Sequence, residues 1–233
     1  MPTDAIAIGT AAMLGFLHAL EVDHMVAVTT FVSRRPSLRS AARFGLRWGV
    51  GHSLAVLLVG GALLATGMRW PERYDAVGEG LVGLMLVGLG GWAVAAARKL
   101  HLHPAEEHGD HAHVHVHGPG GVHAHPHHEA QPGAHDHGGI TLVGLLHGLA
   151  GTTGVVALVP VTMMDRVGLG LGYLTAFGLG VTASMTLFAV AASVLMRRAT
   201  RASLLWGRRS VMLVGLAGIG IGLWWAARAA GIL

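Results

Sequence analysis

Residues 5–32 read AIAIGTAAMLGFLHALEVDHMVAVTTFV. This run is long enough to cross a bilayer, for which a helix needs about 20 mostly apolar residues. Its middle carries four ionisable residues within seven positions: His18, Glu21, Asp23 and His24. Ionisable side chains are costly at bilayer depth, and where they occur they mark ion paths, proton relays or ligand sites. The segment therefore predicts both a membrane-spanning fold and the place where its chemistry occurs.

The rest of the chain has the composition of a membrane protein. Only 12% of its 233 residues are charged, whereas a soluble domain has about 25% charged residues. The apolar runs are continuous and lack a two-residue alternation, so they predict helices rather than the strands of a β-barrel. We expect an all-α membrane protein with six transmembrane helices, at residues 5–32, 46–67, 77–97, 140–164, 169–196 and 210–230.

The two halves of the chain resemble each other. The segment Leu-His-Ala-Leu at 17–20 matches Leu-His-Gly-Leu at 146–149, and the same offset places Gly49 and Gly51 on Gly178 and Gly180. A nearly equal offset relates the segments 82–92 and 214–224. Three spans per half make the halves enter the membrane from opposite sides, which is an inverted repeat of the kind common in transporters. We expect two inverted three-helix repeats, 1–97 and 140–233.

Residues 98–139, between the two halves, differ in kind from the spans. Segment 101–137 contains thirteen of the seventeen histidines. Its composition cannot build a core, so we expect this loop to be disordered when no metal is bound. Dense imidazole favours divalent ions such as Ni²⁺, Cu²⁺, Zn²⁺ and Co²⁺, although a solvated spacer or a pH-responsive linker is an alternative. The candidate metal-capturing residues of this loop are His111, His113, His115, His117, His123, His125, His127 and His128.

The basic residues indicate an orientation. Twelve of the sixteen Lys and Arg residues lie in segments 33–47, 98–99 and 197–209. The positive-inside rule then places both termini outside the cell (inner) membrane and the His-rich loop in the cytoplasm. Trp48, Trp70 and Trp206 lie near expected span ends, where interfacial aromatic residues occur. Because the basic residues flank spans, the formal charge of +4 gives no reason to expect a nucleic-acid partner.

The opening cluster has the chemistry of a transition-metal site, because imidazole and carboxylate together suit first-row divalent ions. On an ideal helix His18 and His24 are separated by about 120° and about 9 Å. Either the helix is distorted between them, or Asp23 and His24 act with His52 of the second span. In the second case His18 and Glu21 form an entry or relay position.

The plainer alternative is a buried histidine that only packs or hydrogen-bonds to a carbonyl group. It applies most readily to His52 or His147 taken alone. No His-Glu-x-x-His sequence or other obvious catalytic set is present, so we do not expect an enzyme. No Gly-x4-Gly-Lys-Ser/Thr motif is present either. Energy for transport would therefore come from a gradient, the membrane potential or a partner.

The motif His18-x4-Asp23-His24 resembles the His-x4-Asp-His signature of the nickel/cobalt transporter superfamily, and Gly51-His52-Ser53 resembles its second motif. The element His-Gly-Leu-Ala-Gly at 147–151 is similar to the six-span UreH-like and HupE-like members. The His-rich loop resembles that of nickel/cobalt efflux members. The family usually reads Arg-His-Ala-x-Asp-Ala-Asp-His, so Leu17 and Glu21 depart from its pattern.

The resemblance implies that His18, Asp23, His24 and His52 recognise nickel or cobalt, with His147 contributing from the second half. It makes Ni²⁺ or Co²⁺ the transported ion and implies no permanent cofactor. The implied partners are the lipid bilayer and cytoplasmic metallochaperones of urease or hydrogenase. We expect uptake for metalloenzyme maturation. Efflux by the same family is one alternative, and a metal-sensing or importer-complex subunit without transport of its own is another.

Overall fold

The computed structural model of the chain describes residues 2–34, 37–68, 73–98, 100–102, 114–116, 137–150, 160–161, 163–164 and 166–232. Helices dominate this part of the chain. They are α1 (Pro2–His18), α2 (Val22–Arg34), α3 (Leu38–Thr66), α4 (Arg73–Arg98), α5 (His137–Ala150), α7 (Val167–Ala202) and α8 (Leu204–Ala229). Two short strands, β1 (Leu100–Leu102) and β2 (Val114–Val116), pair antiparallel within the segment that the sequence predicts to be a loop.

Several of these helices are long and apolar enough to cross a membrane. Four qualify alone, namely α3, α4, α7 and α8. Helices α1 and α2 qualify only together, as a pair bent by 57°, which makes up to five candidate spans. The expected continuous span 5–32 is therefore broken. The apolar part of α5, Ile140–Leu149, is shorter than a span, and residues 151–159 of the expected fourth span lie outside the described residues.

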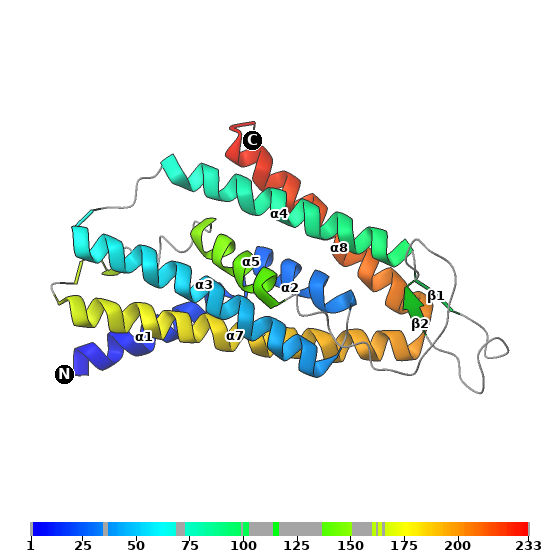
Figure 1. Cartoon of the computed structure of the whole chain (residues 1–233), viewed down its shortest axis with the longest axis horizontal. Coiled ribbons are helices and arrows are strands. Elements are labelled where there is room, and N and C mark those ends of the chain that lie inside the picture. Colours follow the sequence, from blue (N-terminus) through cyan, green and yellow to red (C-terminus); the bar gives the residue numbers. More distant parts are fainter. Residues whose placement is uncertain are drawn as a thin grey trace.

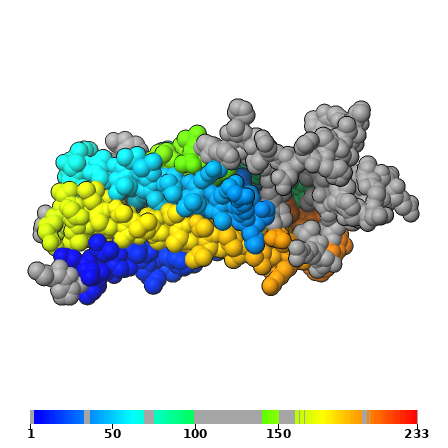
Figure 2. All heavy atoms as spheres, turned by 60° about the horizontal axis from the view of Figure 1, so that its bottom comes forward, coloured from blue at the N-terminus to red at the C-terminus, as the bar shows by residue number. Residues whose placement is uncertain are grey.

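Two short helices, α2 and α5, lie at the centre of the bundle between two layers (Figure 1). In one layer α7 packs along α1 and α3, and α3 also packs along α5. Figure 2 shows α7 between α1 and α3 along one face. In the other layer α4 pairs with α8, and α2 reaches α4, α7 and α8. The ionisable segment at the start of α2 is therefore enclosed by longer helices.

Glycines allow the first layer to pack through its backbones. A Cβ atom on Gly15 of α1 would collide with the carbonyl oxygen of Phe177 on α7. A Cβ atom on Gly144 of α5 would collide in the same way with the carbonyl oxygen of Trp48 on α3. The two glycines, like their two partners, are separated by the same sequence offset that relates the two His-containing segments. Helix α1 thus meets α7 as α5 meets α3.

Helices α3 and α7 cross where small residues face each other. The Ser53 hydroxyl can donate its proton to the carbonyl oxygen of Gly49, at 2.6 Å, or to that of Gly178, at 2.8 Å. It also lies 3.1 Å from the Thr182 hydroxyl, another pair of residues related by the repeat offset. The helices are antiparallel, because Gly45 packs on Thr186 and the later residue Leu64 packs on Gly170.

The two ends of the bundle are distinct. At one end Ala93 and Ala97 of α4 form a buried cluster with Met196 of α7 and Val211 of α8, and α3 begins at this same end. We call it the loop end, because the chain there adjoins the segments 34–38, 98–137 and 202–204. At the opposite, terminal end, Arg166 donates to Asp4. Helix α3 ends there too, at Thr66, and is capped by Gly67, whose φ of +66° suits glycine.

Candidate metal site at the bend of the first span

The break between α1 and α2 is built by a change in backbone hydrogen bonding. The N–H groups of Leu20 and Glu21 donate to the carbonyl oxygens three residues earlier, at 3.0 Å each, which tightens the last turn of α1. The carbonyl oxygen of Glu21 then accepts the first hydrogen bond of α2, from the N–H of Met25. No proline or glycine occupies residues 19–21. This break supplies the distortion that His18 and His24 need in order to meet.

His18 ends α1 and is oriented by Glu21, which lies within the break. The Nδ1 atom of His18 donates to the Oε1 atom of Glu21 at 3.2 Å. The His18 ring is buried, whereas the Glu21 side chain is 35% exposed. Because Nδ1 carries the proton, the other ring nitrogen of His18, Nε2, has its lone pair free for a cation.

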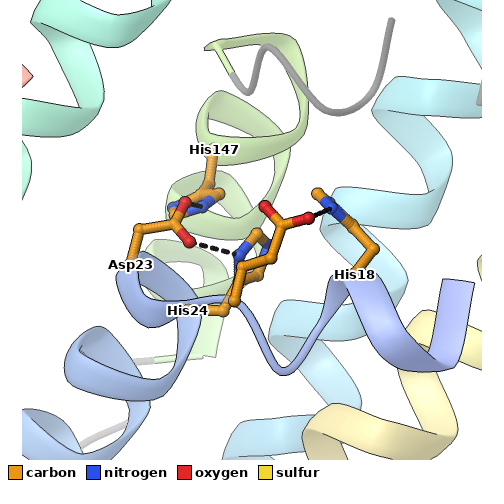
Figure 3. A network of polar contacts seen from close by, with 5 residues as sticks. His18, Asp23, His24 and His147 are labelled. Carbon is orange, nitrogen blue, oxygen red and sulfur yellow. Dashed lines mark hydrogen bonds and ion pairs between the residues drawn. The ribbon is translucent and has the colours of Figure 1, made fainter. Parts of the chain in front are cut away.

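Asp23 lies in the first turn of α2 and joins the two halves of the chain (Figure 3). Its Oδ1 atom accepts from the Nδ1 atom of His24 at 3.1 Å. Its Oδ2 atom accepts from the Nε2 atom of His147 on α5, also at 3.1 Å. These bonds fix the tautomers of both histidines and leave the Nε2 atom of His24 and the Nδ1 atom of His147 without a proton.

His52 of α3 completes a cluster of four buried histidine rings. The His52 ring centroid lies 5.3 Å from that of His18 and 5.2 Å from that of His24. His18 and His24 are 4.7 Å apart, and His24 and His147 are 4.2 Å apart. The four rings are at most 6% exposed. One cluster therefore collects residues from α1, α2, α3 and α5.

The cluster has unused ligand atoms. Within the described part of the chain, five buried histidine nitrogens have no hydrogen-bond partner: His18 Nε2, His24 Nε2, His147 Nδ1 and both nitrogens of His52. Such groups are costly to bury unpaired. Their number in one place indicates a site built to receive a cation rather than a set of packing histidines.

The ligand atoms form two overlapping groups. One is His18, His24 and His52, and the other is Asp23, His24 and His147; within each group the ligand atoms lie within 4.8 Å of one another. Two nitrogens bound to one ion at about 2.1 Å can be at most about 4.2 Å apart. Ligand atoms at the upper limit of 4.8 Å would therefore have to move at least about half an ångström closer together to bind one ion. His24 belongs to both groups.

The helix ends add to the attraction for a cation. Helix α1 ends at His18 and α5 ends three residues after His147, so two helix C-termini converge on the cluster. The partial negative charge of a helix C-terminus favours cations. Asp23 lies in the first turn of α2, where the positive end of that helix favours a carboxylate.

The structure brings together more of the candidate residues than a straight first helix would allow. His18, Asp23, His24 and His52 meet in one site, with Glu21 at its edge. His147, which the sequence treats as a secondary contributor, contacts Asp23 directly. Of the candidate loop histidines, only His115 is described, as backbone in β2. The predicted loop residues His111, His113, His117, His123, His125, His127 and His128 lie outside the described residues.

Two aromatic residues of the site were missed from the sequence. Trp48 was expected at a membrane interface, but it is 1% exposed and its ring centroid lies 5.7 Å from that of His147. That expectation was wrong because α3 begins at Leu38, which puts Trp48 well inside the helix. Phe177 lies 5.6 Å from His18. Its only sequence signal is that the repeat offset relates it to Trp48.

Comparison with known proteins identifies one similar chain. The urease accessory protein UreH of Bacillus sp. (strain TB-90) is 28% identical over 184 residues, which cover 76% of this chain and 71% of that protein. No family model and no solved structure matches the chain. The similarity confirms the UreH-like resemblance that the motifs indicate.

Proposed function

We propose that this UreH-like chain is a multi-pass membrane permease for Ni²⁺ or Co²⁺. The observation that carries the proposal is the buried cluster of His18, His24, His52 and His147, with five unpaired ring nitrogens at a bend in a membrane helix. Neutral imidazole is a preferred ligand for nickel and for neighbouring first-row ions. With no cysteine in the chain, thiolate ligation is excluded.

On this proposal the chain's residues share the work between binding and orienting. The free nitrogens of His18, His24 and His52 replace part of the ion's hydration shell. Asp23 and Glu21 hold their histidine partners in the binding tautomer, as carboxylates commonly do around metal sites. The negative charge of Asp23 also offsets part of the positive charge of the ion in an apolar surrounding.

The proposed architecture is six spans in two inverted repeats, 1–97 and 140–233. Its support is the reciprocity of the contacts: α1 meets α7 as α5 meets α3, and α3 meets α7 at the pair Ser53 and Thr182. In α4 and α8, Gly83 packs on Gly222 and Gly90 packs on Gly215. Ion sites near the centre of such repeats, at discontinuous helices, are typical of secondary transporters.

The proposed orientation puts the loop end on the cytoplasmic side of the cell (inner) membrane and both termini on the outer side. Its support is that the starts of α3 and α8 and the ends of α4 and α7 gather their arginines at this end. The His-rich segment 98–139 would then capture or deliver metal on the cytoplasmic side. Metallochaperones of urease or hydrogenase are its proposed partners.

Transport in proteoliposomes tests this function. Purified protein is reconstituted and the flux of radioactive ⁶³Ni²⁺ is followed, with unlabelled Co²⁺ as competitor. Wild type should carry the ion, and Asp23→Ala should abolish the flux. The matched control is Glu79→Gln, because Glu79 is a helix carboxylate that accepts from Arg228 at 3.4 Å outside the site.

The same variants separate the alternatives when metal is also measured in cells. Accumulation in cells that express the chain supports uptake, whereas a lowered metal content supports efflux. Metal binding without flux in any direction would overturn the permease and favour a sensor or importer-complex subunit. Normal flux in Asp23→Ala would show that the buried cluster is structural.

A further inference from the structure

We propose that Trp48 and Phe177 are the two gates of the ion path, each closing the histidine cluster from one end of the bundle. The proposal rests on the proposed function for its cargo, but the gates themselves follow from the placement of these two rings. Both are among the largest fully buried side chains of the described structure, and each packs on one histidine of the cluster.

Trp48 closes the cluster toward the loop end. It precedes His52 by four residues on α3, which begins at the loop end, so it lies about 6 Å from His52 along the helix. Its ring meets the His147 ring edge-on, at 60° and 5.7 Å. Its indole Nε1 atom is buried and has no partner among the described residues. An unpaired indole N–H is not expected of a residue that only fills a core.

Phe177 closes the cluster toward the terminal end. It precedes Thr182 by five residues on α7, which begins at the terminal end. Because Thr182 lies level with Gly49, Phe177 lies on the terminal side of the crossing of α3 and α7. Its ring covers the His18 ring at 5.6 Å, with 33° between the planes. The cluster is thus bracketed by one aromatic ring on each side.

The two rings are equivalent positions of the two halves. The repeat offset relates Trp48 to Phe177, and it also relates their histidine partners, His18 and His147. The backbone contacts repeat as well. Gly15, on the helix of His18, packs against the carbonyl oxygen of Phe177, and Gly144, on the helix of His147, packs against that of Trp48. The same device therefore occurs twice, once on each face of the site, as alternating access requires of two gates.

Beyond Trp48 lies a cavity on the loop-end side of the cluster. An apolar cavity of about 290 Å³ lies at the loop end of α2, α3, α4 and α5. Its walls include Phe31, Phe44 and Trp92 together with Trp48 itself, so Trp48 separates this cavity from His147. Phe31 and Phe44 stack at 4.0 Å on the same wall. Apolar constrictions of this kind exclude hydrated ions until a side chain moves.

The absence of cysteine makes the test direct, because one introduced thiol can be followed alone. His52→Cys places it in the cluster, and a charged, membrane-impermeant maleimide is applied from either side of sealed vesicles. Ser37→Cys at the loop end and Met68→Cys at the terminal end report which side is which. With both rings present, Cys modification should be slow from both sides.

Each gate variant is made in the His52→Cys background and should open one side only. We expect Trp48→Ala to speed modification from the loop end by about an order of magnitude, and Phe177→Ala to do so from the terminal end. The matched controls are Trp48→Phe, which keeps an aromatic ring at the loop-end gate, and Tyr173→Ala, which removes a buried aromatic residue one turn before Phe177. Neither control should raise the rate.

The readout does not need metal transport, so its failure is distinct from failure of the proposed function. Unchanged modification rates in both gate variants, or equal acceleration from both sides, would overturn the gates even if ⁶³Ni²⁺ flux is normal. One-sided acceleration in the His52→Cys background, together with a wild-type protein that carries no nickel, would keep the gates and reject the cargo. If an alanine variant fails to fold, Trp48→Leu and Phe177→Leu should give the same one-sided pattern, and Trp48→Phe should stay closed.

Discussion

The Oδ2 atom of Asp23 accepts a hydrogen bond from the Nε2 atom of His147, a residue of the other half of the chain. Both side chains are almost fully buried. The bond joins the first turn of α2 to the last turn of α5, so the two halves of the chain share one carboxylate. The packing of α5 against α2 and the binding of a cation at the site therefore both depend on the hydrogen bond between Asp23 and His147.

Replacing Asp23 should weaken metal binding by way of its two histidine partners. Asp23→Asn keeps a carbonyl oxygen but loses the charge, and orienting carboxylates of metal sites are typically worth about 10–100-fold in affinity. Asp23→Ala releases both His24 and His147 and should cost more. Titration of purified protein with Ni²⁺ measures both, with Glu79→Gln as the unaffected control. Equal affinity in all four proteins would mean that Asp23 has no part in the site.

Glu21 should affect metal binding by orienting His18. Its carboxylate holds the Nδ1 proton of His18, so Glu21→Gln frees that ring to turn or to change tautomer. Because Glu21 is 35% exposed, we expect a smaller loss of Ni²⁺ affinity than in Asp23→Asn, about tenfold or less.

A double-variant cycle checks the route of this effect. In a His18→Ala background, Glu21→Gln should cause no further loss of Ni²⁺ affinity, because its partner is already gone. With His18 present, Glu21→Asp should bind Ni²⁺ more tightly than Glu21→Gln, since aspartate is the residue that the family motif usually carries at this position. Additive losses in the double variant would show that Glu21 contacts the ion itself.

The His-rich segment should capture metal without forming the transport site. Deleting residues 103–136 leaves the described cluster of His18, His24, His52 and His147 in place. We expect the deletion to lower the number of Ni²⁺ ions bound per chain while one buried site keeps its affinity, because the loop imidazoles are separate ligands. Equilibrium dialysis counts both classes. Loss of all binding in the deletion would place the working site in the loop.

The sequence predicted the class of the fold and the core of the site for physical reasons. Apolar runs longer than the bilayer is thick require helices, and the cost of burying His18, Asp23 and His24 marks them as candidate functional residues. The bend was one of two alternatives. It could not be decided beforehand because no proline or glycine marks residues 19–21, and hydrogen bonding of Leu20 and Glu21 to the preceding turn makes it.

The parts that sequence reasoning missed depend on tertiary contacts. His147 was predicted only as a contributor from the second half, and its hydrogen bond to Asp23 depends on where α5 packs, which the local sequence does not encode. Trp48 was misplaced because helix α3 begins two turns before the expected start of the second span. Phe177 is one apolar residue among many in an apolar helix, and only the position of His18 beside it gives it meaning.

The close approach of α1 to α7 and of α5 to α3 gives a test of the packing that holds the site. Gly15→Ala and Gly144→Ala each place a methyl group against a backbone carbonyl that cannot move aside. Overpacking of this kind costs about 1–3 kcal/mol, so both variants should melt at lower temperature in detergent.

Gly9→Ala is the matched control, because Gly9 lies on α1 with nothing within 4 Å of an added Cβ atom. It should melt at the same or a higher temperature, since alanine favours a helix by about 1 kcal/mol over glycine. Equal melting of Gly9→Ala and Gly15→Ala would mean that α1 does not touch α7 through its backbone, and His18 would lose the support that holds it against Phe177.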